Sequence, residues 1–244
     1  MISIIIPLYN EEDNVDSYDT DLFPVVDTIA NEYNMTFDFI FVNDGSKDRT
    51  REKITAIAAR RSDVRVLNHE RNRGMGAALK TGFSQTDADL IITMDSDLTF
   101  RPEDIPALLE AYARDRPDCV SGSPYLEAGL MEEVTPMRLF FSKTVNFMYR
   151  VLLRQPITCV SPIFRLYKAD TLKKLDLESE NFEINAEIIS KCLIYGYRVV
   201  EVPVTLYRRK YGESKINIRR EIFNNLNMMR KIVRTKYFHQ PWRS

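Results

Sequence analysis

Two aspartates, Asp95 and Asp97, come directly after the apolar run DLIITM and are separated by one small residue. Side chains two apart in an extended segment point the same way, so the two carboxylates are expected to converge. Converging carboxylates repel each other unless a cation lies between them, and oxygen ligands suit Mg²⁺ or Mn²⁺, which also bind phosphate oxygens. Zinc is disfavoured because no histidine lies nearby. The pair therefore favours a metal that bridges to a diphosphate, and the plainer alternative is a cap on the next turn.

Two further polar clusters follow apolar runs that look like strands. YNEED (9–13) comes after ISIIIPL, and NDGSKD (43–48) comes after FDFIFV. Strand-like and helical runs alternate over the first 120 residues, which predicts an α/β fold with a mostly parallel sheet covered by helices on both sides. Ligands bind beyond the carboxyl ends of the strands in such sheets. The three clusters are therefore expected to meet at one functional edge.

The elements that must position these clusters are read from hydrophobic periodicity and turn residues. Strands are expected at 2–9, 37–44, 64–69, 89–94, 118–123 and 198–208, with strand-like character also over 158–170. Helices are expected at 14–34, 50–61, 72–85 after a glycine turn, 102–115, 138–153, 182–197 and 217–234. The last of these carries an apolar stripe of Ile218, Ile222, Leu226, Met229 and Val233.

Composition excludes several classes of protein. The chain has 244 residues, 44% of them hydrophobic, and a net charge of -1, which gives no indication of a nucleic-acid binder. The three cysteines are widely spaced and predict buried thiols in a reducing compartment. The apolar runs are all shorter than 18 residues, and the first ten residues read as a strand rather than a signal peptide. A cytoplasmic protein is expected.

Four segments, in order, resemble the successive signatures of family 2 glycosyltransferases. They are SIIIPLYNEEDNV, FVNDGSKDRT, NRGMGAALKTGF and MDSDLTFRPEDIP. The resemblance implies the GT-A fold and a nucleotide-sugar donor. It also implies that Asp95 and Asp97 hold the metal, with Asp97 as the favoured direct ligand. The nucleotide pocket would then be lined by Pro7, Tyr9, Glu11 and Asp44.

The second half resembles dolichyl-phosphate mannosyltransferases and related polyprenyl-phosphate enzymes, through SGSPYLEAG, RLFFS and YRRKYGESK. By that resemblance Arg138 and Ser142, four apart on one helix face, bind the lipid phosphate. Arg209 bridges the donor phosphates and the acceptor, and Ser214 and Lys215 complete its motif, with Lys215 on the donor side. The chain departs from the pattern at Pro124, where relatives often carry arginine, and at CVSPIFRLYKAD (159–170), which lacks D-x-x-S-G-F.

The resemblance implies an inverting transferase that moves a sugar from a nucleotide sugar to dolichyl or polyprenyl phosphate. GDP-mannose is favoured over UDP-sugars by resemblance alone. A phosphate acceptor is already ionised and needs no base, whereas a saccharide acceptor needs a carboxylate base, for which Glu183 and Glu187 are candidates. A family 2 enzyme for a soluble or saccharide acceptor is thus the first alternative, and a catalytically silent nucleotide-sugar binding subunit is the second.

We expect one GT-A domain over 1–215, with a nucleotide-sugar half (1–120) and an acceptor half (121–215), followed by a basic C-terminal extension (216–244). Between residues 208 and 236 there are ten basic and two acidic residues. The apolar helix over 139–153 is either core or a segment lying in the membrane interface. The basic helix could add attraction to anionic lipid. Together these features predict a peripheral enzyme at the cytoplasmic membrane face, or one that relies on a separate membrane-spanning partner.

Overall fold

The computed structural model of the chain describes residues 1–132, 134–211 and 218–242, with the backbone alone described for 218–221. Its centre is a seven-stranded sheet with the strand order β3-β2-β1-β4-β6-β5-β7. The strands are β1 (Ile2–Leu8), β2 (Phe37–Asn43), β3 (Val64–Asn68), β4 (Leu90–Thr93), β5 (Cys119–Ser123), β6 (Arg165–Lys168) and β7 (Val199–Pro203). All neighbouring strands are parallel except β6, which runs antiparallel to β4 and β5.

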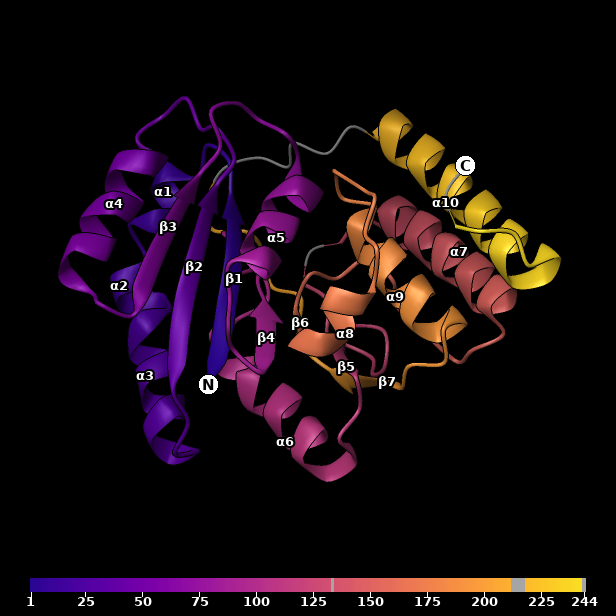
Figure 1. The fold of residues 1–244 in the computed structure, drawn as a ribbon, viewed down its shortest axis with the longest axis horizontal. Coiled ribbons are helices and arrows are strands. Elements are labelled where there is room, and N and C mark those ends of the chain that lie inside the picture. Colours follow the sequence, from indigo (N-terminus) through magenta and orange to yellow (C-terminus); the bar gives the residue numbers. More distant parts are fainter. Residues whose placement is uncertain (133, 212–217, 243–244) are drawn as a thin grey trace.

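Helices connect the strands and close both faces of the sheet. They are α1 (Glu12–Val15), α2 (Tyr18–Asp21), α3 (Phe23–Glu32), α4 (Thr50–Arg60), α5 (Met75–Ser84), α6 (Ile105–Asp115), α7 (Pro136–Leu153), α8 (Ala169–Lys174), α9 (Ile184–Ile194) and α10 (Ile218–Phe238), with a 3₁₀ turn, η1 (Pro102–Asp104), before α6. In Figure 1, β3 and α4 lie at one end of the molecule, and α7, α9 and α10 are grouped at the other.

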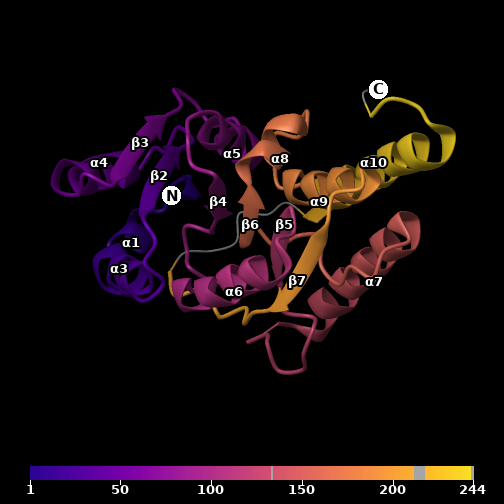
Figure 2. The same ribbon diagram turned by 60° about the horizontal axis from the view of Figure 1, so that its bottom comes forward.

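Alternation along the strands divides the core into two layers. Ile4 and Ile6 of β1 pack in one cluster with α3, α4 and α6, whereas Ile5 packs in a second cluster with α5. Every residue of β1 is buried, as expected for a parallel strand covered on both faces. Figure 2 shows α3 and α6 on one side of the sheet and α5, α8 and α9 on the other. The predicted α/β fold with a mostly parallel sheet is confirmed.

Three expected elements differ from the structure. The strand expected over 198–208 ends at Pro203. The single helix expected over 14–34 is three short helices, and Pro24, which lacks a backbone N–H, lies in the first turn of the third, α3. The strand-like segment 158–170 forms a strand only at β6. Before β6 the backbone N–H groups of Thr158 and Cys159 donate to the Glu201 carboxylate, at 2.7 and 3.0 Å, instead of joining a ladder.

The apolar stripe of α10 is buried over only part of its length. Ile222 and Leu226 are exposed, whereas among the side chains described for this helix, those over 222–238, the buried apolar ones are Met228, Met229 and Ile232. The buried face of α10 therefore only partly coincides with the apolar stripe of its sequence. Within the described ranges, no helix is both long enough and apolar enough to span a bilayer.

Candidate functional site

The loops after β1 and β2 interlock at the carboxyl edge of the sheet. The backbone N–H of Asn10 donates to Ser46 Oγ at 3.0 Å, and that of Glu11 donates to Thr50 Oγ1 at 2.8 Å. In return Lys47 N–H donates to Asn10 Oδ1 at 2.7 Å. The first two polar clusters of the sequence are thus one structural unit.

The third cluster, after β4, joins the same edge because β4 is the other neighbour of β1. Tyr18 Oη donates to the Ser96 carbonyl at 2.9 Å, which ties the segment of the two aspartates to α2, a helix that follows the first loop. Asp97 is buried, and its Oδ1 accepts from the backbone N–H of Thr99 at 3.1 Å. The predicted meeting of the three clusters at one edge is confirmed.

Asp95 lies in a field of negative charge. Part of the residue is exposed to solvent, but its carboxyl group is closely surrounded by protein atoms. This burial raises the pKa of the carboxyl group well above the usual range. The charge of Asp97 raises that pKa further, Arg209 lowers it, and Glu11 adds a smaller increase. Burial likewise raises the pKa of Tyr18, followed by the charges of Glu11, Asp97 and Asp95. The edge therefore concentrates carboxylates in a poorly solvated setting.

Arg209 reaches this cluster from the other half of the chain. Its Nη2 lies 2.6 Å from Asp97 Oδ2, in an ion pair whose carboxylate side chain is 4% exposed and whose guanidinium side chain is 31% exposed. The segment after β7 is held in place two residues earlier, where Tyr207 N–H donates to the Thr99 carbonyl at 2.9 Å. The Tyr207 ring also lies 3.6 Å beneath the Arg101 guanidinium. A basic residue far along the chain is thereby fixed beside the aspartates.

The carboxylates fit a divalent cation that arrives with phosphate oxygens. In the part of the chain that the structure describes, no three His, Cys, Asp or Glu side chains are placed to hold a metal by themselves. Mg²⁺ is commonly held by one or two carboxylates together with substrate phosphates. Asp95 and Asp97 offer such a set: burial first, and then the charge of Asp97, raise the pKa of Asp95, and Arg209 lowers it only in part.

The other residues expected at the nucleotide pocket lie at the same edge. Pro7 is buried in β1 opposite Val42, and Tyr9 follows β1 directly, half-buried. Asp44 is buried at the end of β2, where its carboxylate accepts from the backbone N–H groups of Arg73, at 2.9 Å, and Gly74, at 2.7 Å. Asp44 therefore also anchors the turn before α5.

The expected acceptor residues form a second group on α7. Arg138 is exposed in the first turn, where its backbone N–H donates to the capping Thr135 Oγ1 at 3.4 Å. Ser142 Oγ accepts from Tyr125 Oη at 2.6 Å. Tyr125 was not singled out from the sequence, although it follows Pro124 in the departing GSPY segment. Ser214 and Lys215 lie outside the described residues.

The two candidate bases of the saccharide alternative have structural partners. Glu187 is fully buried, lies 2.6 Å from Lys191 Nζ, and accepts from the backbone N–H groups of Glu178 and Ser179 at 3.0 and 2.8 Å. Glu183 accepts from Asn224 Nδ2 of α10 at 2.9 Å. Glu187 thus fastens the segment before α9 rather than facing an acceptor.

Similarity to known proteins agrees with this arrangement. Residues 3–176 match the family described as Glycosyl transferase family 2. A dolichol-phosphate mannosyltransferase of Pyrococcus furiosus is 32% identical over 217 residues, covering 88% of this chain and 59% of that protein. An undecaprenyl-phosphate mannosyltransferase of Micrococcus luteus is 32% identical over 219 residues, covering 87% of this chain and 86% of that one.

Among solved structures, glucosyl-3-phosphoglycerate synthase of Mycobacterium tuberculosis shares the fold. Its complex with Mn²⁺, uridine diphosphate and glucosyl-3-phosphoglycerate aligns with a TM-score of 0.65 at 17% identity, over 96% of this chain and 78% of that one. Other crystals of the same enzyme contain Mg²⁺ and uridine diphosphate. The GT-A fold expected from the sequence is confirmed. From the match over most of its length and from its mannosyltransferase relatives, this chain belongs to glycosyl transferase family 2.

Proposed function

We propose that the chain transfers mannose from GDP-mannose to the phosphate of a polyprenyl phosphate, with inversion at the anomeric carbon. The names of the Pyrococcus and Micrococcus relatives support the sugar and the lipid class. This chain spans 59% of the Pyrococcus protein, so the proposal concerns the part that the two share. The division into a donor half (1–120), an acceptor half (121–215) and an extension (216–244) is part of the proposal.

The ion pair between Arg209 and Asp97 is the observation that carries the proposal. A transferase with an anionic acceptor must bring two phosphate groups together, and their repulsion is lowest where a fixed cation lies between them. Arg209 comes from the acceptor half and touches an aspartate of the donor half. It is therefore placed to lie between the leaving diphosphate and the attacking phosphate.

The residues of the chain have distinct parts in the transfer. Pro7, Tyr9, Glu11 and Asp44 shape the nucleotide pocket, and Asp95 and Asp97 would hold Mg²⁺ or Mn²⁺ together with the donor. When bound, the cation offsets the charge of the leaving diphosphate. Lys215 is assigned to the donor phosphates by its motif. No general base is required, because a phosphate oxygen is already ionised at neutral pH.

Ser142 and Arg138 orient the acceptor phosphate. Tyr125 donates its hydroxyl hydrogen to Ser142 Oγ at 2.6 Å, so the Ser142 hydroxyl hydrogen remains available to a phosphate oxygen. Burial raises the pKa of Tyr125, which keeps the phenol protonated and donating at neutral pH. An oxygen of the oriented phosphate attacks the anomeric carbon as the bond to the diphosphate breaks, giving a β product from an α donor.

A two-phase assay tests the function directly. The protein, Mn²⁺ or Mg²⁺, and dolichyl phosphate are incubated with labelled GDP-mannose or labelled UDP-glucose, and lipids are extracted into organic solvent. We expect label in the organic phase with GDP-mannose. Label with UDP-glucose alone would contradict the assigned sugar. Product in the aqueous phase alone would favour the saccharide alternative, and donor binding without transfer or hydrolysis would favour a silent binding subunit.

We further propose that α7 rests on the membrane surface. One side of this helix, at three-to-four spacing, exposes large apolar side chains: Met137, Phe140, Phe141, Phe147, Met148 and Val151. The opposite side packs inward through Asn146, Tyr149 and Leu153. The helix also carries Arg138, Lys143 and Arg150 and no acidic residue. An outward apolar stripe with basic flanks is typical of helices that lie in the interface of an anionic bilayer.

Vesicle flotation tests this orientation without any substrate. The double variant Phe140→Ser/Phe147→Ser should float with anionic vesicles at least about tenfold less than the unchanged protein, because burying each ring stabilises binding by about 1.5 kcal/mol or more. Met35→Ser, which alters an exposed apolar residue after α3 at the other end of the molecule, serves as the matched control. Equal flotation of both variants would contradict the α7 proposal.

A further inference from the structure

A buried histidine links the donor edge to the body of α5. His69, which follows β3, has its Nδ1 2.7 Å from Asp44 Oδ1 and its Nε2 2.9 Å from Thr81 Oγ1. Its side chain is 6% exposed and that of Asp44 is 3% exposed. The backbone N–H of His69 also donates to the Asn43 carbonyl at 2.9 Å, and this hydrogen bond fixes the backbone that carries the ring.

Each hydrogen bond of this network can pair one donor with one acceptor. An ionised carboxylate only accepts, so Nδ1 of His69 donates to Asp44. The same carboxylate oxygen accepts from the backbone N–H of Arg73, and the other accepts from Gly74. Nε2 meets a hydroxyl, Thr81, which can either donate to it or accept from it. The imidazole is therefore held from both sides and fixes the orientation of the Asp44 carboxylate.

That carboxylate in turn fixes the turn over residues 71–74, which is confined on two further sides. A Cβ atom on Gly45 would overlap the backbone of Arg71 and Asn72. Gly74 has φ of 99°, and a Cβ there would overlap the Glu180 carbonyl. The turn thus fits between the β2 edge and the segment before α9, and the hydrogen bonds that its N–H groups donate to Asp44 set its position.

The turn lies against the loop after β2, beside the edge proposed for the donor, and the side chains of its Arg71 and Arg73 are exposed. We propose that His69 is a positioning residue for the donor: acting through Asp44, it holds the 71–74 turn in the conformation that binds the nucleoside diphosphate. This inference rests on the proposed function. It assigns a role to a residue outside the catalytic groups, and no motif of the sequence pointed to it.

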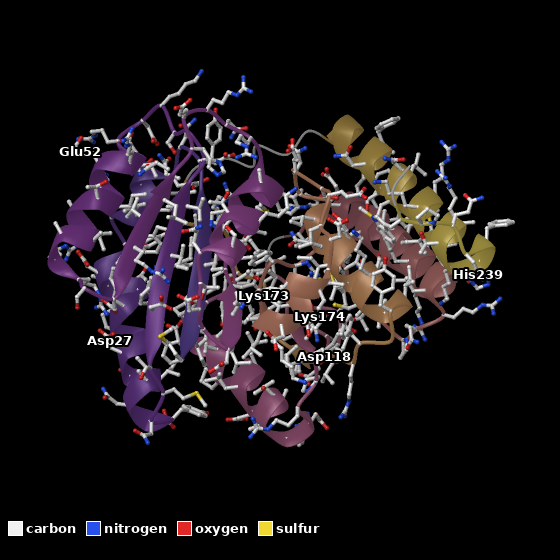
Figure 3. The ribbon with its side chains drawn as sticks, viewed as in Figure 1. Asp27, Glu52, Asp118, Lys173, Lys174 and His239 are labelled. Carbon is white, nitrogen blue, oxygen red and sulfur yellow. The ribbon has the colours of Figure 1, made fainter. Side chains whose placement is uncertain are left out.

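Calorimetric titration of the full chain with GDP and with UDP, each with Mn²⁺, tests the role apart from sugar transfer. His69→Phe fills the site without hydrogen bonds and should weaken nucleotide binding about tenfold or more, because a hydrogen bond to a charged group is lost. His69→Gln keeps an amide N–H for Asp44 and should restore most of the affinity. The matched control is His239→Phe, which changes the other histidine, exposed beyond the end of α10 (Figure 3).

A melting curve of each variant separates positioning from simple stability. If His69→Phe melts lower yet binds both nucleotides as tightly as the unchanged protein, the ring is only structural and the inference is overturned. The same holds if His69→Gln binds no better than His69→Phe. Should His69→Phe fail to fold, Thr81→Val removes only the outer hydrogen bond and should weaken binding by a smaller factor. If the unchanged protein binds neither nucleotide, the proposed function fails first and the inference with it.

Discussion

Replacing Arg209 by methionine should move metal binding and sugar transfer in opposite directions. The Nη2 of Arg209 lies 2.6 Å from Asp97 Oδ2. At that separation Coulomb's law with an effective dielectric of about 20 gives an attraction of roughly 6 kcal/mol as an upper limit. Because the guanidinium side chain is 31% exposed, solvent screening reduces the cost of its removal to about 1–3 kcal/mol.

The substitution leaves the carboxylates of Asp95 and Asp97 without the Arg209 charge, and this sets the direction of the change in melting temperature, Mn²⁺ affinity and transfer. Without metal, Arg209→Met should melt about 3–10 °C below the unchanged protein, because a chain of this size loses about 2–4 °C per kcal/mol. Mn²⁺ no longer has to displace a guanidinium from Asp97, so its apparent affinity without nucleotide should rise roughly tenfold. Transfer should nevertheless fall, because the cation proposed to lie between the two phosphates is gone.

Melting curves in EDTA and across a Mn²⁺ titration, followed by the two-phase transfer assay, measure all three quantities. Lys210→Met is the matched control, because its ion pair with Asp21 spans 2.5 Å and is more exposed. That variant should shift the melting temperature by no more than a few degrees and leave Mn²⁺ affinity unchanged. The reasoning is refuted if Arg209→Met melts like the unchanged protein in EDTA and binds Mn²⁺ no more tightly.

Three further outcomes are expected. Tyr125→Phe should raise the KM for polyprenyl phosphate several-fold while leaving the KM for the donor unchanged, because Ser142 loses the hydrogen bond that orients it. Because the pKa of Asp95 is raised in the folded state, the metal-free protein gains stability as pH falls through that pKa and loses stability as pH rises. Asp95→Asn should therefore raise the melting temperature in EDTA at pH 7.5 and make the melting temperature depend less on pH, although transfer is lost. Glu187→Gln should lower the melting temperature by roughly 10 °C, because it leaves Lys191 buried without a counter-charge. If Glu187 were a catalytic base instead, the variant would lose turnover and keep an unchanged melting curve.

The donor half was predictable because its signals are local. The buried run of β1 and the polar residues that follow it are contiguous in the chain, and the βαβ pattern alone places Asp95 at the same edge as Glu11. The expected bounds of β1, β2, β3 and α4 agree with the structure to within one or two residues. The break of the first helix at Pro24 was also readable, since proline favours the first turn of a helix.

The acceptor half was harder to read because its interactions are non-local. No residue near Glu187 in the sequence indicates that its carboxylate accepts hydrogen bonds from the backbone N–H groups of Glu178 and Ser179. The sequence alone therefore leaves Glu187 as a candidate base. The segment before β6 has strand propensity, but the Glu201 carboxylate satisfies its N–H groups instead. His69 carries no motif, and its role depends on Thr81 of α5, which only the fold brings near.

The contact between Arg209 and Asp97 places a condition on catalysis. Oδ1 of Asp97 accepts the Thr99 N–H and Oδ2 pairs with Arg209, so a metal bound through Oδ2 would have to take the place of the guanidinium or share that oxygen with it. A displaced guanidinium would remain close to the aspartates, because Tyr207 ties its segment to Thr99. An incoming diphosphate would offer it a further anion beside Asp95. In this scheme donor binding moves Arg209 from carboxylate to phosphate, so the cation needed for the acceptor is released when the donor is in place.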